Sequence, residues 1–129
     1  MSSAAQYAST VRAAAAQVTT ANPNRDGTTG TYVNVFTAGA TLGSRIDDIY
    51  MTATVTTAAG MIRLFISDGT NTRLLSETPV AAITVGATTA AWTAVLLNQA
   101  LILPSGYILK ASTEVSNAIN IIVTRAGDF

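Results

Sequence analysis

The feature that most constrains the fold of this chain is the alternation of apolar and polar side chains in short segments separated by turn-forming residues. A period of two places apolar side chains on one face of an extended strand, whereas an amphipathic helix needs apolar residues three and four positions apart. The segment 46–55 is the clearest case, with Ile49, Met51, Ala53 and Val55 on one face and Asp48, Tyr50, Thr52 and Thr54 on the other. From residue 31 onward such segments recur about every 10 to 14 residues without a sustained helical period, which predicts an all-β chain.

Seven or eight strands are expected. They are 32–36, 46–55, 62–66, 72–77, 91–97, 107–113 and 118–125, with a brief further strand at Ile83–Val85. The clearest hairpin joins 62–66 to 72–77, because the intervening Asp68-Gly69-Thr70-Asn71 supplies turn-forming residues. Antiparallel strands with this spacing in a chain of 129 residues are typical of a single sandwich domain. We expect an antiparallel β-sandwich with jelly-roll-like topology.

Residues 1–30 differ in character from the rest of the chain. Four consecutive alanines, Ala13–Ala16, favour a helix by propensity alone, but the β-branched residues on either side favour an extended strand. A short helix, a first strand over Val11–Thr20 and an extended arm are the alternatives, and we prefer the strand or arm. Asn22–Gly27 is a dense run of turn formers that indicates a hinge. The predicted division is an arm or first strand with its hinge at 1–30, followed by a β-sandwich domain at 31–129.

The side chains offer little chemistry for catalysis. The sequence contains no His and no Cys, only 11% charged residues, and seven Asp plus Glu. Enzymes that work near neutral pH usually depend on His, Cys or carboxylates with shifted pKa values. The glycines also show no phosphate-binding spacing. We therefore expect no enzymatic activity, no cofactor and no metal site.

The distribution of charge argues against two classes of partner. Seven Lys and Arg balance the seven acids, so the net formal charge is +0, and the bases are scattered singly. Nucleic-acid binding needs a basic surplus, so nucleic acid is not an expected partner. The uncharged stretch Thr78–Leu109 is long enough to span a bilayer, but prolines, a glycine and amides interrupt it, and strands explain it better. The opening residues lack the pattern of a signal peptide.

Two local features invite a functional interpretation. The adjacent carboxylates Asp47 and Asp48 suggest a catalytic or metal-binding pair, but neighbours on a strand point to opposite faces and should not converge on one atom. We expect one of them to pair with Arg45. Trp92, the only tryptophan, lies among small apolar residues. Such surroundings favour burial in the core or at a subunit contact over a sugar-binding platform.

A set of segments carries a resemblance to a known class of proteins. These segments are Ala16–Asn22, Asn24–Gly27, Val35–Gly39, Gly43–Asp47 and Leu103–Tyr107. With them the chain resembles small virion proteins encoded among the head genes of tailed bacteriophages. Such proteins include capsid decoration or cement proteins, all-β modules that sit as trimers or dimers on the shell and brace it. The resemblance implies a non-enzymatic protein of the virion head surface, made in the host cytoplasm, that binds the major capsid protein and bridges capsomers.

Self-association is also expected from the composition. Zero net charge together with 49% hydrophobic residues leaves more apolar surface than a small two-sheet core can hide, so we expect a homo-oligomer and favour a trimer. The candidate partner-contact residues are Tyr7, Arg12, Asn22, Arg25 and Trp92. An alternative function is a receptor- or glycan-binding module of a phage fibre or tail.

Overall fold

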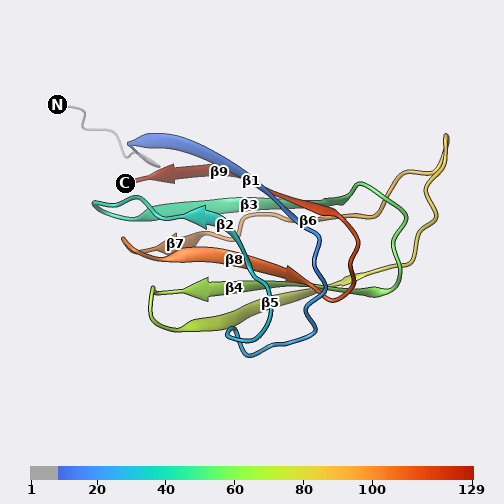
Figure 1. Cartoon of the computed structure of the whole chain (residues 1–129). Helices are drawn as coiled ribbons and strands as arrows, with labels where there is room; N and C mark the ends of the chain where they lie inside the picture. The colour runs from blue at the N-terminus through green and yellow to red at the C-terminus, as the bar shows by residue number, and fades with distance from the viewer. Residues whose placement is uncertain (1–8) are drawn as a thin grey trace.

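Nine strands and no helix make up the part of the chain that the structure describes. The structure is a computed structural model, and it describes residues 9–129. The strands are β1 (Thr10–Val18), β2 (Val33–Thr37), β3 (Ser44–Ala53), β4 (Gly60–Ser67), β5 (Thr72–Val80), β6 (Thr93–Leu96), β7 (Leu101–Leu103), β8 (Ile108–Thr113) and β9 (Ile119–Asp128). They form two antiparallel sheets packed as a β-sandwich (Figure 1), which confirms the all-β prediction. Residues 9–129 thus contain no helix that could cross a membrane.

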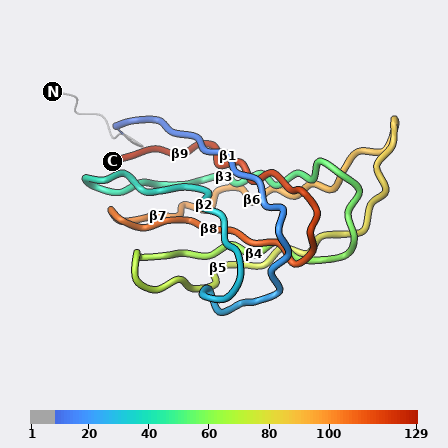
Figure 2. Tube along the Cα trace, viewed as in Figure 1, coloured from blue at the N-terminus to red at the C-terminus, as the bar shows by residue number. Residues whose placement is uncertain are grey.

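The two sheets are built from nested strand pairs. Sheet A has the order β1-β9-β3-β6, with β7 also pairing with β3, and sheet B has the order β2-β8-β4-β5. The nested pairs are β1 with β9, β2 with β8, β3 with β6, and β4 with β5. The first half of the chain therefore pairs with the second half in reverse order (Figure 2), and β3–β9 and β4–β8 join these pairs into sheets. As a result, the N–H of Ser9 donates to the carbonyl of Asp128 at 2.8 Å.

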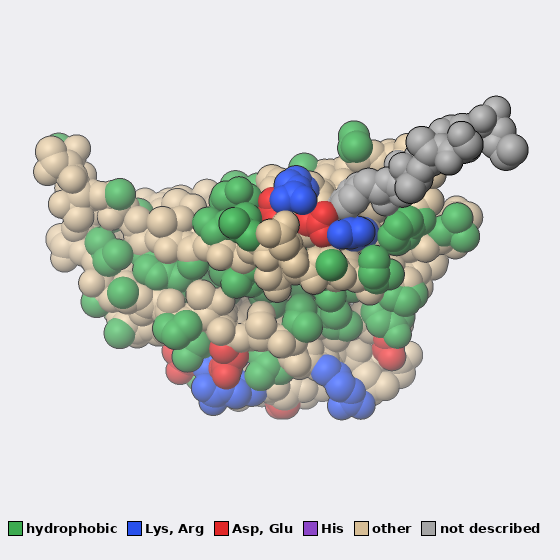
Figure 3. Space-filling view, turned by 180° about the vertical axis from the view of Figure 1, so that it is seen from behind, with side chains coloured by type: hydrophobic (Ala, Val, Ile, Leu, Met, Phe, Trp, Pro, Cys, Tyr) green, Lys and Arg blue, Asp and Glu red, His purple; other side chains and the backbone are tan. Residues whose placement is uncertain are grey.

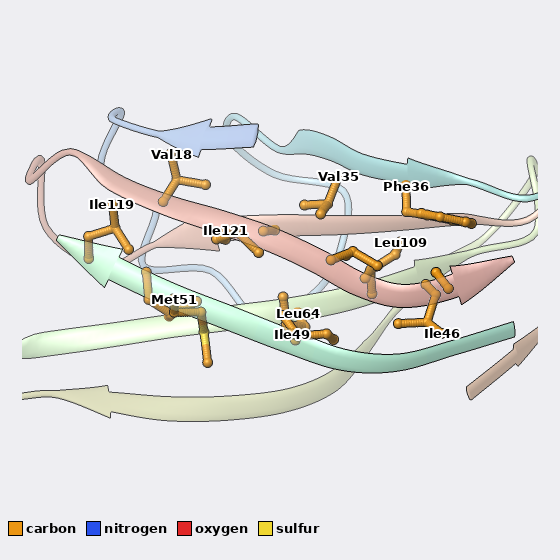
Figure 4. Packing of buried hydrophobic residues seen from close by; sticks show 14 of the residues in the cluster. Val18, Val35, Phe36, Ile46, Ile49, Met51, Leu64, Leu109, Ile119 and Ile121 are labelled. Atoms are coloured by element: carbon orange, nitrogen blue, oxygen red, sulfur yellow. The ribbon is translucent and has the colours of Figure 1, made fainter. Parts of the chain in front are cut away.

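The hydrophobic core fills the space between the inner faces of the two sheets. On β3, Ile49, Met51 and Ala53 are buried while Tyr50 and Thr52 are exposed, as the period-two pattern predicts. Figure 4 shows side chains from both sheets meeting in this layer, among them Val18, Val35, Phe36, Ile46, Leu64, Leu109, Ile119 and Ile121. Burial of each large apolar side chain contributes about 1.5–3 kcal/mol. The core therefore accounts for why the alternation was the strongest signal in the sequence.

Turn chemistry forms the predicted hairpin between β4 and β5. The carboxylate of Asp68 accepts hydrogen bonds from the N–H groups of Thr70 at 2.8 Å and Asn71 at 2.7 Å. Gly69, which lies between Asp68 and Thr70, has a φ of 96°, a left-handed conformation that glycine adopts without steric cost. These backbone hydrogen bonds also hold the pKa of Asp68 below its ordinary value.

Three details differ from the expected strands. β7 was not expected, because a strand of three residues is too short to show alternation. Ile83–Val85 is not a strand, since Ile83 pairs only with Thr57 in an isolated bridge. Val55 was expected to face inward, but it lies beyond the end of β3 and is 40% exposed.

The N-terminal alanines form a strand, which is one of the alternatives that the sequence left open. β1 lies at the edge of sheet A and pairs with β9 from Thr10 to Val18. Ala14 and Ala16 pack against the core, and Val18 is 1% exposed. Pairing with β9 and burial of this face outweigh the helical propensity of alanine, which amounts to only tenths of a kcal/mol per residue, roughly 0.7 at most.

Candidate interaction surfaces

The outer face of sheet B is covered by the chain's own residues 19–32. The ring of Tyr32 packs edge-on against the buried ring of Phe65, with 4.8 Å between the ring centroids and an interplanar angle of 85°. Asn22 is 1% exposed, and its backbone N–H donates to the carbonyl of Thr113 at 2.7 Å. This segment therefore occupies much of the outer face of sheet B, where it would obstruct the binding of another protein.

The turn-rich part of this covering segment is organised by Asn22. Its side-chain oxygen accepts a hydrogen bond from the N–H of Asn24 at 3.1 Å, and its side-chain nitrogen donates to the carbonyl of Thr31 at 3.0 Å. Gly30, with a φ of 91°, packs directly on the Asn22 side chain, where a Cβ would collide with it. The predicted hinge at Asn22–Gly27 is thus tied to the body of the protein.

Ion pairs fasten the covering segment to sheet B. Arg63 on β4 is 2% exposed and donates to Glu77 at 2.8 Å and to Glu114 at 2.6 Å. Arg25 in the covering segment donates to the same Glu77 oxygen at 2.6 Å. Hydrogen bonds from Arg25 and then Arg63 hold the pKa of Glu77 below its ordinary value. The two arginines and two glutamates form a chain of ion pairs with no net charge.

A loop of residues 81–92, which joins β5 to β6, projects from one end of the sandwich (Figures 1 and 3). The sequence of this projecting loop contains no charged residue. Gly86 and Thr89 pair through two backbone hydrogen bonds of 3.1 and 3.3 Å and so form a tight tip. Val85 beside the tip is 37% exposed. A connection of this length is unusual in a compact domain and commonly serves a function.

The base of the projecting loop is held firmly. Thr57 exchanges backbone hydrogen bonds of 3.0 and 3.2 Å with Ile83, and its hydroxyl donates to the carbonyl of Ala81 at 2.7 Å. On the other side of the base, Trp92 is 6% exposed and belongs to the core. The carbonyl of Trp92 accepts a hydrogen bond from Ala53 at 2.8 Å. The loop therefore presents its exposed tip from a fixed base.

The outer face of sheet A is exposed, in contrast to that of sheet B. The strand registers place Ala15, Ile122, Tyr50 and Val95 in one line across β1, β9, β3 and β6. Ile122, Tyr50 and Val95 are 37, 40 and 42% exposed. The adjacent line is polar and uncharged, and consists of Gln17, Asn120, Thr52 and Thr93. We call this surface, formed by the two lines, the bare face.

The polar side chains of the bare face bind one another. Gln17 donates to the side-chain oxygen of Asn120 at 2.8 Å, and the hydroxyls of Thr52 and Thr93 lie 3.4 Å apart. The Thr93 hydroxyl also donates to the carbonyl of Met51 at 3.1 Å. These contacts satisfy part of the hydrogen-bonding capacity of the bare face, which reduces the penalty for covering its polar groups.

Beyond the apolar line, both β3 and β9 depart from strict alternation. Ile46 and Ile49 are both buried in the core, although an odd number of steps separates them, so the strand is irregular at Asp47–Asp48. Arg125 on β9 has a φ of 50° and lies 3.3 Å from Asp48 and 3.8 Å from Asp47. The two carboxylates thus share the guanidinium of Arg125. Strict alternation predicted that they point to opposite faces, but the irregularity of the strand directs both toward the same side chain.

The carboxylate of Asp48 and the backbone carbonyl of Asp47 also support the loop between β6 and β7. Asn98 donates its N–H to the Asp48 carboxylate at 3.1 Å, and Gln99 donates its N–H to the Asp47 carbonyl at 2.8 Å. Asn98 and Ala100 have φ values of 54° and 48°, and with Arg125 they are the positive-φ non-glycine residues among those described. Such conformations are strained and persist only where neighbouring contacts fix them. As predicted, Arg45 pairs with Asp47, at 3.0 Å.

An apolar cavity of about 190 Å³ lies beside this loop, between the two sheets. It is lined by Ile49, Leu64, Leu75, Leu96 and Leu101, with Ser76 and Gln99 completing the wall. These residues place it on the side of the sandwich where β5 faces β6 and β7. The sandwich is therefore not tightly closed on this side.

Arg12 closes the opposite side of the sandwich. Its guanidinium donates to the carbonyl of Thr37 at 2.7 Å, pairs with Asp128 at 3.0 Å, and lies 4.0 Å from the centre of the Phe36 ring. The hydroxyl of Ser44 and then Arg12 hold the pKa of Asp128 below its ordinary value. Arg12 therefore joins the edges of the two sheets.

The predicted contact residues are dispersed over the fold. Tyr7 lies outside the described residues. Asn22 and Arg25 come together in the cover of sheet B, whereas Arg12 bridges the sheets and Trp92 supports the projecting loop. Four of the five are thus engaged within the chain itself, although Arg25 keeps 57% of its side chain exposed.

Sequence reasoning did not single out the bare face or the projecting loop. Alternation placed Tyr50 on the outer side of its strand, which was the available signal. The line with Ile122 and Val95 depends on the pairing register, which a single sequence does not reveal.

No group of three or more acidic side chains within residues 9–129 is arranged to hold a metal ion. Comparisons of the sequence with models of protein families and with curated proteins found no match.

Proposed function

We propose that this chain is a non-enzymatic structural protein of a bacteriophage head, a decoration or cement protein that binds the outer surface of the shell and stabilises it by bridging capsomers. The major capsid protein is the proposed partner, and the virion head is the proposed location. The proposal joins the sequence resemblance to a geometry suited to assembly.

The strand order supports this role. In a jelly roll, eight strands form two sheets through two Greek keys, and viral capsid domains are among the proteins built this way. The four nested pairs of this chain use eight strands divided between two sheets, with β7 as an addition. We therefore propose a jelly-roll topology. One fold can serve many functions, so the function depends on the surfaces that the fold presents.

The projecting loop is the observation that carries the proposal. It presents an uncharged, exposed tip from a base fixed by Thr57 and Trp92, so little order must be gained when it binds. Contacts made by such a tip depend on apolar area and main-chain hydrogen bonds. Ordinary salt screens charges beyond about 8–10 Å, so attachment of this kind should be insensitive to ionic strength.

Co-sedimentation with purified heads that lack the protein tests the proposal. We expect hundreds of bound copies per head, retained in about 1 M NaCl and in EDTA, and we expect these heads to resist heat better than bare heads. Val85→Asp in the loop should weaken binding at least tenfold, because burying a charge is costly. Leu74→Asp on β5 is the matched control, since Val85 and Leu74 are both 37% exposed.

Several outcomes would contradict the proposal. Release by EDTA or moderate salt would indicate a metal or ion-pair attachment. Equal binding by the Val85→Asp and Leu74→Asp variants would exclude the loop as the contact. A few to a few dozen copies per particle would indicate a tail component.

Residues 1–8 precede β1. If this N-terminal segment contributes to attachment, its removal should weaken binding to the heads without unfolding the protein.

A further inference from the structure

We propose that the bare face binds the bare face of a second copy of the chain, so that the protein is a dimer with sheet A of each copy at the interface. This inference goes beyond the proposed function, because it concerns a surface other than the projecting loop. A pair formed in this way would carry two loops and could contact two shell subunits at once.

The apolar line is the centre of the proposed contact. Ile122 and Tyr50 lie on the two middle strands of sheet A, with Val95 and Ala15 on the strands that flank them. Two sheets pack face to face about 10 Å apart with their strands rotated by about 30°. A two-fold axis through the middle of the line places the line of one copy over that of the other, so each apolar side chain meets an apolar surface.

The charges of this side of sheet A are compatible with an identical partner. Arg45 and Arg125 balance Asp47 and Asp48, so the cluster beside the apolar line is neutral. The uncharged polar line already contains the Gln17–Asn120 and Thr52–Thr93 contacts. Two copies therefore meet without net repulsion, and part of the hydrogen-bonding capacity of the polar line is already satisfied within each copy.

The whole outer face of sheet A, of which the bare face is one part, has the size that a stable pair needs. β3 and β9 each contain ten residues and, at about 3.3 Å per residue, are about 33 Å long. Beside β1, β9 and β3, the fourth column of the sheet is shared by β6 and β7, which both pair with β3. Four columns spaced about 4.8 Å apart give a width of about 19 Å, so the whole outer face of sheet A measures about 600 Å². Two such faces bury about 1,200 Å², which reaches the lower end of the range for stable interfaces.

The geometry favours a pair over the trimer that the composition suggested. Packing of one face on an identical face engages that face fully in both copies and is complete with two chains. A three-fold assembly would need two different surfaces on each copy. Outside the bare face, sheet B carries its own cover, fastened by Arg25 and Arg63.

The mass of the full chain in solution is the first test. At micromolar concentration we expect twice the chain mass of 13.3 kDa by light scattering. Ile122→Glu should weaken the dimer by at least about 100-fold and give the mass of one chain, since residues central to an interface dominate its affinity. Leu74→Glu is the matched control, because Leu74 and Ile122 are equally exposed. Circular dichroism should show that both variants are folded.

A cross-link locates the contact independently. The sequence contains no cysteine, so a single introduced cysteine is unique. Under mild oxidation, Ile122→Cys should form a disulfide-linked dimer in good yield and Leu74→Cys should not. A wild-type monomer, a trimer, or a dimer that Ile122→Glu leaves intact would overturn the inference. If the free chain is a monomer and Ile122→Glu abolishes binding to heads, the bare face contacts the shell, and the proposed function stands without the dimer.

Discussion

Ala100 provides a direct test of the strained loop between β6 and β7. Its φ of 48° lies in the left-handed region, which costs a residue with a Cβ about 1–2 kcal/mol. Ala100→Gly removes this cost, but glycine also increases the conformational entropy of the unfolded chain, which lowers the stability of the folded protein by about 0.4–1 kcal/mol. The net expectation is an increase of about 0.5–1 kcal/mol in the free energy of unfolding.

The corresponding shift in melting temperature follows from the size of the chain. At about 2.1 cal/mol/K per residue, the 129 residues have an unfolding entropy of about 270 cal/mol/K. Ala100→Gly should therefore raise Tm by about 2–4 °C. The control is Ala15→Gly, an exposed position within β1, where glycine should lower stability by about 0.5–1 kcal/mol.

The two variants are expected to move Tm in opposite directions, and fluorescence of Trp92, the only tryptophan, reports both transitions. A denaturant titration should show the same slope for both variants and the wild type, so that differences in midpoint reflect stability. If Ala100→Gly lowers Tm as Ala15→Gly does, the left-handed strain at position 100 is refuted.

The remaining predictions concern the loop base and the carboxylates. Trp92→Ala should lower the free energy of unfolding by about 3–5 kcal/mol, seen by circular dichroism as a fall in Tm of roughly 11–18 °C, with a smaller effect for Trp92→Phe. Glu77 and Asp128 have lowered pKa values in the folded state, compared with their ordinary pKa values of 4.5 and 3.8. Their carboxylates therefore stabilise the folded protein at a pH above these ordinary values, and this contribution is lost as the pH falls below them. Urea midpoints should accordingly decline from about pH 5 toward pH 3, and less steeply in Glu77→Gln.

The fold class was accessible from the sequence because the core imposes its period on the strands. Ile49, Met51 and Ala53 on β3 are buried at every second position, and the turn at Asp68–Asn71 marks a chain reversal with its own chemistry. Both signals are local. A window of ten residues therefore suffices to detect them.

The surfaces were less accessible because they depend on contacts between distant residues. Asp48 pairs with Arg125, which lies 77 positions further along the chain. The cover of sheet B likewise depends on the ion pair between Arg25 and Glu77, which are 52 positions apart. Arg63 is a third case of a contact between distant parts of the chain. Arg63 alternates with the inward-facing Ile62 and Leu64, and the covering segment together with Glu77 and Glu114 buries it on the outer side of its sheet.

The nesting of the strands also has a consequence for the order in which the protein can fold during synthesis. β1 pairs with β9, and 101 positions separate Val18 from its partner Ile119. At about 5–20 residues per second, β9 emerges from the ribosome roughly 5–20 s after β1. Throughout that interval β1 and one edge of β3 have no neighbour. Topologies dominated by such distant pairings fold slowly. The newly made chain therefore spends its first seconds with β1, whose only charged residue is Arg12, open to pairing with other nascent chains.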